Sequence, residues 1–187
     1  MVEVIGLGLE GVFEIRPPKF DDARGFFSET WNAAKLAKAG ISINFVQDNH
    51  SFSRSRGIMR GLHFQIPPFA QDKLVRVLRG SVFDVAVDIR KGSPTFGKWV
   101  AVTLSSRQWN QMLVPKGFAH GFVTLEPDTE VVYKVSAPYS RPHDRSIRFD
   151  DPDIAIDWPV PATEMVLSAK DEAAPFLAGL ETGFTYQ

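Results

Sequence analysis

The sequence predicts an all-β protein, an antiparallel sandwich or jelly-roll β-barrel with a few short peripheral helices. Several short segments are rich in β-branched and aromatic residues, which strands favour. Clusters of Gly, Pro, Ser and Asp separate these segments, and such residues form turns. Helical signals are scarce. Regular short strands with turns between them are typical of all-β sandwiches and barrels.

The expected strands follow one another through the middle of the chain. In order, they are LVRVL (74–78), SVFDVAVDI (81–89), KWVAVTL (98–104), QMLVP (111–115), HGFVTL (120–125) and TEVVYKVS (129–136). The turns between them contain Arg79-Gly80, Gly92-Ser93-Pro94, Lys116-Gly117 and Glu126-Pro127-Asp128. We expect strands this short, joined by such turns, to pair antiparallel.

Two segments outside this region predict short helices. ETWNAAKLAKAG (29–40) has a helical pattern that ends at Gly40, and AAPFLAGL (173–180) is a second candidate. No internal repeat, low-complexity tract or linker interrupts the chain. We therefore expect one domain that spans residues 1–187.

The composition is that of an ordinary globular protein and argues against several function classes. Hydrophobic residues make up 44% and charged residues 23% of the 187 residues, and the net charge is −1. A nearly neutral chain has no net electrostatic field that would attract nucleic acid or an anionic membrane. No apolar run is long enough to span a bilayer. With no Cys, the chain has no disulfide, thiolate ligand or cysteine nucleophile. Glu3 and Glu10 stand where a secretion signal would be basic, so we expect a cytoplasmic location.

Strand alternation predicts that two polar side chains point into the barrel. Tyr133 shares a face with Val131 and Val135, two positions away on either side. Lys73 shares a face with Val75 and Val77. A buried lysine or tyrosine is costly unless it is paired or used in function. Arg60 and His63 have opposite parity. Both can line one pocket only if the strand contains a bulge, which Gly61 would permit.

Two short motifs resemble those of the cupins, a superfamily of jelly-roll barrels. The first cupin motif runs Gly, five residues, His, one residue, His, and then a Glu. Gly57 and His63 fit it, but Gln65 replaces the second His and no Glu follows in PPFA. The second motif, Pro-x-Gly-x-x-His, is complete as PKGFAH, which ends at His120. The chain thus resembles a cupin-type jelly roll, and because two His without a carboxylate make a poor metal site, we expect no bound metal.

His63 taken alone has two interpretations. Imidazole titrates near neutral pH, which suits a general base, but a buried histidine satisfied by hydrogen bonds is equally compatible. The accompanying residue types favour the base. Proton removal next to a ketone needs a cation where the enolate charge develops, such as Lys73 or Arg60, and an acid on the opposite face, such as Tyr133. Asp171 in SAKD could support the base, or it could close a helix capping box in that segment.

The chain as a whole resembles the dTDP-4-dehydrorhamnose 3,5-epimerase family, metal-free cupin enzymes that act on sugar nucleotides. The segments that carry the resemblance are DARGFFSETW, FVQDNHSFS, GIMRGLHFQ, QDKLVRVLRGSVFDVAVDIRKGSPTFGKW, VPKGFAHGF, IRFDDPDIAIDWP and LSAKD. Together they cover almost the whole chain and are highly specific. The resemblance implies that His63 is the general base and Asp171 its carboxylate partner. It also implies that Tyr133 is the acid on the opposite face and Lys73 the cation beside the ketone oxygen.

The same resemblance implies a set of residues that bind the sugar nucleotide. They are Arg24, Glu29, Gln47, Asp48, Asn49, Arg60, His120, Asp144 and Lys170. Phe27 or Tyr139 is expected to stack on the thymine ring. Two positions depart from the family, because Asp144 stands where Glu is usual and Leu113 where many members have Trp.

Some of these residues also have structural explanations when taken alone. Arg24 suits a surface turn, and Glu29 suits the first turn of a helix. The Gln47-Asp48-Asn49 run suits an Asx-rich turn. The family pattern across the chain favours ligand binding for all of them.

The resemblance implies epimerisation of dTDP-4-dehydro-6-deoxy-D-glucose at carbons 3 and 5, which gives dTDP-4-dehydro-L-rhamnose without a cofactor. It also implies a homodimer in which an N-terminal segment contributes residues to the neighbouring site. Two alternatives stay open: an epimerase acting at one carbon of a related dTDP-keto-deoxysugar, and a non-catalytic binder of sugar nucleotides. A base and an acid on opposite faces argue against the binder, because a binder needs neither.

Overall fold

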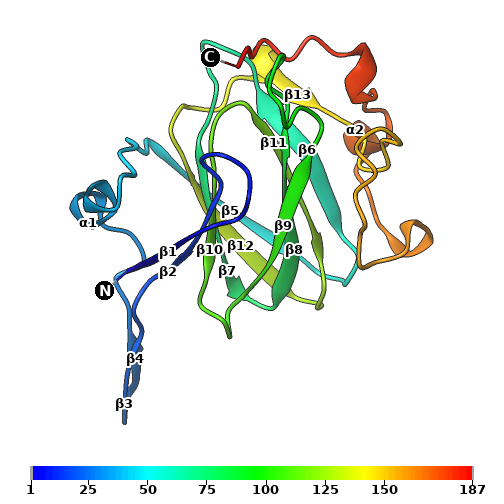
Figure 1. The fold of residues 1–187 in the computed structure, drawn as a ribbon. Helices are drawn as coiled ribbons and strands as arrows, with labels where there is room; N and C mark the ends of the chain where they lie inside the picture. Colours follow the sequence, from blue (N-terminus) through cyan, green and yellow to red (C-terminus); the bar gives the residue numbers. More distant parts are fainter. Residues whose placement is uncertain (1, 187) are drawn as a thin grey trace.

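Two antiparallel β-sheets face each other in a barrel-like sandwich (Figure 1). The structure is a computed structural model that describes residues 2–186. One sheet consists, in spatial order, of β1 (Glu3–Gly6), β2 (Phe13–Arg16), β10 (Gln111–Val114), β7 (Lys73–Arg79), β12 (Thr129–Val135) and β5 (Gln47–Ser53). The other consists of β13 (Asp144–Ser146), β6 (Met59–Gln65), β11 (Phe118–Thr124), β8 (Ser81–Asp88) and β9 (Trp99–Ser105). The predicted all-β class is confirmed.

The main hydrophobic core fills the space between the two sheets. Val75, Val77 and Val131 of the six-stranded sheet belong to the same cluster as Val82 and Ala86 of the five-stranded sheet. Within each strand these residues share one parity, as the period of two requires. Full burial of one such valine is worth roughly 1.5–3 kcal/mol. The alternation therefore decides which face of each strand points inward.

The outer face of the five-stranded sheet is buried as well. Val85, Val87 and Ala119 pack against the C-terminal part of the chain, which supplies Ile154 and Leu177. This second layer explains why β8 and β11 are buried along almost their whole length. It also brings the C-terminal segments over β6, next to the cleft described below (Figure 1).

The outer face of the six-stranded sheet is covered by α1 (Ala33–Lys38) and the segment after it. Leu36 and Ile41 pack there on Ile15, Leu74 and Leu113. The remaining helical elements are α2 (Ala169–Glu172) and the 3-10 turns Arg141–His143, Ala162–Glu164 and Leu177–Gly179. Within residues 2–186, no helix is long and apolar enough to cross a membrane.

The strands β3 (Phe20–Asp22) and β4 (Gly25–Phe27) form a separate hairpin that projects from the barrel (Figure 1). Phe20 and Phe27 are 60% and 70% exposed. Phe26 stacks edge-on against Trp109, with a centroid distance of 4.7 Å, and this contact attaches the hairpin to the barrel.

Two of the alternative structural explanations do not hold, and one expected helix is wrong. The Gln47-Asp48-Asn49 run opens β5 and is not a turn. The first helix begins at Ala33, so Glu29 does not lie in its first turn. The AAPFLAGL segment contains only the 3-10 turn Leu177–Gly179. Pro175 explains this last difference, because proline disfavours helical backbone at the residue before it and lacks a backbone donor.

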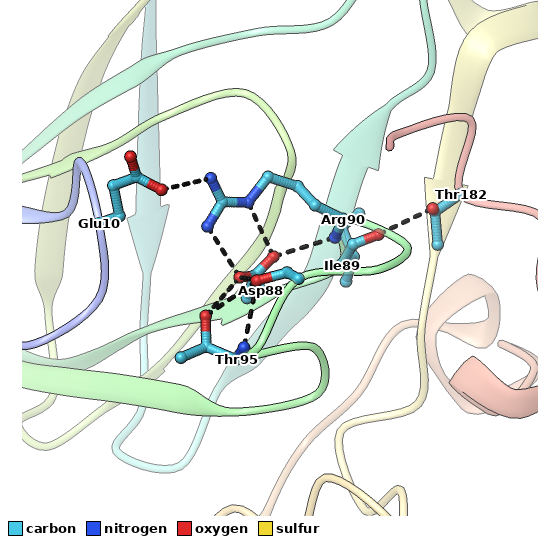
Figure 2. A network of polar contacts seen from close by, with 7 residues as sticks. Glu10, Asp88, Ile89, Arg90, Thr95 and Thr182 are labelled. Atoms are coloured by element: carbon cyan, nitrogen blue, oxygen red, sulfur yellow. Dashed lines mark hydrogen bonds and ion pairs between the residues drawn. The ribbon is translucent and has the colours of Figure 1, made fainter. Parts of the chain in front are cut away.

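A polar network at the end of β8 holds the loop that follows (Figure 2). Asp88 is fully buried and accepts hydrogen bonds from Arg90, Ser93 and Thr95. Arg90 also pairs with Glu10 at 3.2 Å. Burial raises the pKa of Asp88, but the hydrogen bonds outweigh burial and hold the pKa below its ordinary value. A buried carboxylate whose oxygens are all hydrogen-bonded in this way stabilises the loop and has no free oxygen for a ligand.

Candidate active site

A cleft between the two sheets gathers most of the predicted functional residues. Its inner lobe has a volume of about 420 Å³ and is lined by Arg60, His63, Lys73, His120, Tyr133 and Asp171, among others. Its outer lobe, of about 290 Å³, includes Gln47, Asn49, Tyr139, Asp144 and Lys170. His63, Lys73 and Tyr133 line both lobes, so the two lobes form one continuous site.

A bulge in β6 brings Arg60 and His63 to the same cavity. His63 pairs with His120 of β11, whereas Arg60 pairs with Phe122, so β6 uses one residue more than β11 across this step. Gly61 has a φ of +132°, and a Cβ at this position would lie 2.5 Å from the backbone of β11. Only glycine tolerates both this φ and this close approach. The predicted bulge is confirmed.

His63 and Asp171 form a hydrogen-bonded pair in the wall of the inner lobe. Nε2 of His63 lies 2.5 Å from Oδ1 of Asp171, although the residues are 108 positions apart in the sequence. Ser168, the N-cap of α2, donates to Oδ2 of Asp171, so the capping box and the pairing with His63 occur together. Burial raises the pKa of Asp171, but His63, Ser168 and Lys170 together lower it below its ordinary value. The Asp171 carboxylate is therefore ionised at neutral pH.

The pairing with Asp171 also sets which nitrogen of His63 carries the proton. A carboxylate only accepts hydrogen bonds, so it favours a proton on Nε2 and leaves the lone pair on Nδ1. An unprotonated ring nitrogen on a histidine that lines the cleft, with a carboxylate bonded to the other nitrogen, is the arrangement of a general base.

Tyr133 and Lys73 approach the cleft from the facing sheet, on the neighbouring strands β12 and β7. Lys73 is buried, and its ammonium group donates a hydrogen bond of 3.1 Å to the carbonyl of His63. Burial lowers the pKa of Lys73 to about 8 and outweighs the attraction of Asp144 and Asp84. Burial raises the pKa of Tyr133, so its hydroxyl group is protonated at neutral pH. The inward orientation predicted for both side chains is confirmed.

A second histidine–carboxylate pair lies beside the first. His120 is the cross-strand partner of His63, and its Nε2 lies 2.8 Å from Oδ1 of Asp84. Both side chains are buried, and burial lowers the pKa of His120 despite the attraction of Asp84. Sequence reasoning missed Asp84. The usable signal was an Asp in an apolar strand, on the same side as Val82 and therefore pointing inward.

The outer lobe collects further polar residues. Gln47 and Asn49 extend from one face of β5 and share a hydrogen bond of 2.8 Å. The hydroxyl group of Tyr139 donates to Asp144 at 3.3 Å, and Lys170 forms an ion pair with the same carboxylate. An exposed tyrosine ring and a lysine suit a ligand that has a planar base and negative charge.

Four of the predicted binding residues lie outside the cleft of this chain. They are Arg24, Phe27, Glu29 and Asp48. The first three lie on or next to the β3–β4 hairpin, where Arg24 pairs with Asp22 at 2.6 Å. Asp48 points to the opposite face of β5 from Gln47 and pairs with Lys134. Their positions do not support a role in this chain's own cleft.

Gln65, which replaces the second His of the cupin motif, has a structural role. Its amide group donates to the carbonyls of Phe69 and Pro138, and its oxygen accepts from the backbone N–H of Ser140. Among residues 2–186, no group of three or more His, Cys, Asp or Glu is arranged to hold a metal ion. The expectation of no bound metal stays a prediction.

The fold and the cleft together define a class, a cupin-type barrel enzyme that moves protons at a carbon next to a carbonyl group. The His63–Asp171 pair lies on the five-stranded side of the cleft and Tyr133 on the six-stranded side. The buried Lys73, on the strand next to that of Tyr133, lines the same lobe. This arrangement suits proton removal from one face of a substrate and proton return on the other.

Comparison with known proteins identifies the family. The sequence model of the dTDP-4-dehydrorhamnose 3,5-epimerase family matches residues 6–179. The dTDP-4-dehydrorhamnose 3,5-epimerase of Sinorhizobium fredii is 53% identical over 96% of this chain and 92% of its own length. The chain belongs to the dTDP-4-dehydrorhamnose 3,5-epimerase family. Its activity is that of an isomerase, the 3,5-epimerase of dTDP-L-rhamnose biosynthesis.

Solved structures of relatives agree with this assignment. The dTDP-6-deoxy-D-glucose-3,5-epimerase of Legionella pneumophila, in complex with dTDP-4-keto-L-rhamnose, has a TM-score of 0.95 at 44% identity and covers 100% of both chains. The dTDP-4-dehydrorhamnose 3,5-epimerase of Bacillus anthracis, with TDP and PPi bound, has a TM-score of 0.91 at 46% identity and covers 94% of this chain and 99% of its own. The cupin-type jelly roll, the family and the 3,5-epimerase activity inferred from the sequence are confirmed.

Proposed function

We propose that the cleft binds dTDP-4-dehydro-6-deoxy-D-glucose and that His63, Asp171, Lys73 and Tyr133 convert it to dTDP-4-dehydro-L-rhamnose. The observation that carries the proposal is that His63 on the five-stranded sheet, backed by Asp171 of α2, lies opposite Tyr133 on the six-stranded sheet. An epimerase must remove a proton from one face of a carbon and return one to the other face. A binder of sugar nucleotides has no use for this pair of groups.

Proton removal begins at His63. The ketone at carbon 4 acidifies the C–H bonds at carbons 3 and 5. Nδ1 of His63 takes one of these protons, and the electron pair of the C–H bond moves into an enolate with its charge on the ketone oxygen. Asp171 stabilises the imidazolium that forms. The ammonium group of Lys73 stabilises the enolate oxygen, and a preorganised donor of this kind is typically worth about 3 kcal/mol.

Proton return at carbon 5 comes from Tyr133. Because burial raises its pKa, the phenol is protonated and available as a donor. The nearby charge of Arg60 opposes this rise and favours the phenolate that remains after transfer. Solvent then reprotonates the phenolate and removes the proton from His63. At carbon 3 the returning proton comes from water. No step requires a cofactor.

The nucleotide part occupies the outer lobe. The exposed ring of Tyr139 stacks on thymine. The pyrophosphate lies where the two lobes meet, so that Lys170 of the outer lobe and Arg60 of the inner lobe contact it by charge-assisted hydrogen bonds. Gln47 and Asn49 lie on the same side of the lobe and bind the polar edges of the nucleotide. Asp144 orients Lys170, and His120 contacts the sugar.

The protein acts as a cytoplasmic homodimer in which the β3–β4 hairpin reaches the partner's cleft. Arg24 and Phe27 would act there, together with Glu29, because all three lie outside their own cleft. A groove of about 580 Å³ beside the hairpin has apolar side chains that include Phe20 and Leu36. Exposed apolar surface of this kind marks protein interfaces. Light scattering coupled to size exclusion should report twice the chain mass, and a monomer would contradict this arrangement.

Deuterium incorporation tests the reaction. The protein is incubated with dTDP-4-dehydro-6-deoxyglucose in deuterated water without added metal, and the incorporated deuterons are placed by NMR. Label at carbons 3 and 5, unchanged by a chelator, supports the proposal. Label at one carbon would indicate an epimerase acting at a single position. No label with the substrate still bound would leave only a binding protein.

The variant Tyr133→Phe tests the assigned acid. It should retain exchange at carbon 3 and lose inversion at carbon 5, because only the phenolic proton is removed. Tyr186→Phe is the matched control, since Tyr186 lies outside the cleft. Full inversion at carbon 5 by Tyr133→Phe would show that another group returns the proton.

A further inference from the structure

Asp84 is a buried carboxylate that the mechanism above does not use. We infer that Asp84 is a positioning residue: it fixes the tautomer of His120 so that Nδ1 of His120 accepts a hydrogen bond from a hydroxyl group of the bound sugar. This inference rests on the proposed function, because it assigns a contact between the sugar and the same cleft.

The surroundings of Asp84 make its position costly. The side chain is fully buried on the inward face of β8, between Val82 and Ala86 of the main core. Its Oδ1 bonds to His120, whereas Oδ2 has no hydrogen-bond partner among residues 2–186. Burial of a polar atom without a partner costs free energy, so such an atom in a native fold requires an explanation.

Asp88 shows what a structural carboxylate looks like on the same strand. It lies four residues further along β8, on the same face of the strand, and is also fully buried. Both of its oxygens accept hydrogen bonds, from Arg90, Ser93 and Thr95 (Figure 2). Within the described residues 2–186, Asp84 lacks such compensation and bonds to His120 alone. Its position is therefore explained by what it does to His120 rather than by the stability of the barrel.

The bond to Asp84 dictates the tautomer of His120. A carboxylate cannot donate, so the proton lies on Nε2 and the lone pair on Nδ1. Nδ1 has no hydrogen-bond partner among residues 2–186, yet it is not one of the buried unpaired atoms there, and His120 lines the inner lobe. Nδ1 is thus the accessible nitrogen and presents an acceptor to the cleft.

An acceptor at this point selects for a hydroxyl group. His120 is the cross-strand neighbour of His63, so its Nδ1 lies beside the base that contacts the sugar carbons. A ketone oxygen cannot donate to this nitrogen, but the hydroxyl groups of the sugar can. Burial lowers the pKa of His120, and so do the charges of Lys73 and His63, which keeps this ring neutral when His63 takes a proton. The two histidines thus have different roles despite their similar carboxylate partners.

The tautomer can be measured directly in the free protein. The chain has four histidines, so protein labelled with ¹⁵N-histidine gives few signals, and His120→Asn assigns that of His120. Two-bond ¹⁵N–¹H correlation spectra distinguish a proton on Nε2 from one on Nδ1. We expect Nε2–H in the unmodified protein. In Asp84→Asn, the introduced amide can donate to Nε2, so the proton should move to Nδ1.

The kinetic effect of Asp84→Asn should follow the change of tautomer. We expect kcat/KM to fall roughly 10- to 100-fold, the loss typical of a partner that orients a polar ligand. Asp88→Asn is the matched control, since it removes an equally buried carboxylate from the same strand. It should leave the His120 tautomer unchanged and kcat/KM within about twofold, even if it lowers thermal stability.

Three results would overturn the inference. One is Nδ1–H on His120 in the unmodified protein, a measurement that needs no variant to fold. Another is Asp84→Asn with the original tautomer, whatever its activity. The third is a changed tautomer with unchanged kcat/KM. Because the tautomer is read without substrate, its failure is distinguishable from failure of the proposed epimerase mechanism, which the deuterium experiment tests.

Discussion

Replacement of Asp171 by Asn tests the general base most directly. In the folded protein, Asp171 accepts a hydrogen bond from Nε2 of His63 at 2.5 Å and is almost fully buried, whereas His63 is one-third exposed. Two unit charges about 4 Å apart interact by about 4 kcal/mol at the effective dielectric constant of about 20 that suits partly buried pairs. The imidazolium formed during proton removal loses this stabilisation in Asp171→Asn. A loss of about 4 kcal/mol corresponds to a decrease in kcat of about a thousandfold.

The new amide has a second effect in the same direction. It can donate to Nε2 of His63, which moves the imidazole proton to Nδ1 and removes the lone pair from the cleft. The assay is kcat at saturating substrate, with deuterium exchange at carbons 3 and 5 as a direct measure of proton removal. Glu172→Gln is the control, because it removes the same charge from the next, exposed residue of α2. A folded Asp171→Asn protein with kcat within tenfold of the unmodified protein would refute the assigned base.

Three further substitutions probe other parts of the site. Because Lys73 must be cationic and its pKa is about 8, kcat/KM should fall as the pH rises through about 8, and Lys73→Arg should move this limb to higher pH. Tyr133 cannot cause this fall in kcat/KM, because burial raises its pKa. If Lys73→Arg left the pH of the fall unchanged, the result would contradict the role of Lys73. Gly61→Ala should lower the free energy of unfolding by about 2 kcal/mol or more, measured by urea denaturation, since it adds backbone strain and a close contact with β11; an unchanged value would refute the steric argument. Arg24→Ala should raise KM about tenfold, the cost of one lost charge-assisted hydrogen bond. When Arg24→Ala chains are mixed with His63→Asn chains, each mixed dimer should contain one intact cleft. If mixing recovered no activity, Arg24 would act within its own chain.

The sequence was informative where the relevant physics is local. Alternation along a strand depends only on the neighbouring residues, and it correctly directed Lys73 and Tyr133 into the barrel. The same parity argument required a bulge between Arg60 and His63, and Gly61 was the residue that could form it. Elements with competing signals were less predictable. The Gln47-Asp48-Asn49 run has turn-forming residues but becomes strand, because pairing with β12 outweighs its local preference.

The sequence by itself determined the all-β class, the inward residues of the central strands and, through its motifs, the resemblance to a family. Apart from the His63–Asp171 pair, which the family resemblance implied, only the tertiary structure decided which polar groups meet. Asp171 lies 108 residues from His63, and Asp84 lies 36 residues from His120. Such pairs depend on which strands become neighbours within the five-stranded sheet and on where α2 packs against it, and no local pattern encodes that placement. The same holds for Arg24, whose motif indicates a ligand while its hairpin carries it outside its own cleft. Side-chain parity is set residue by residue, whereas the site is set by packing across the whole barrel.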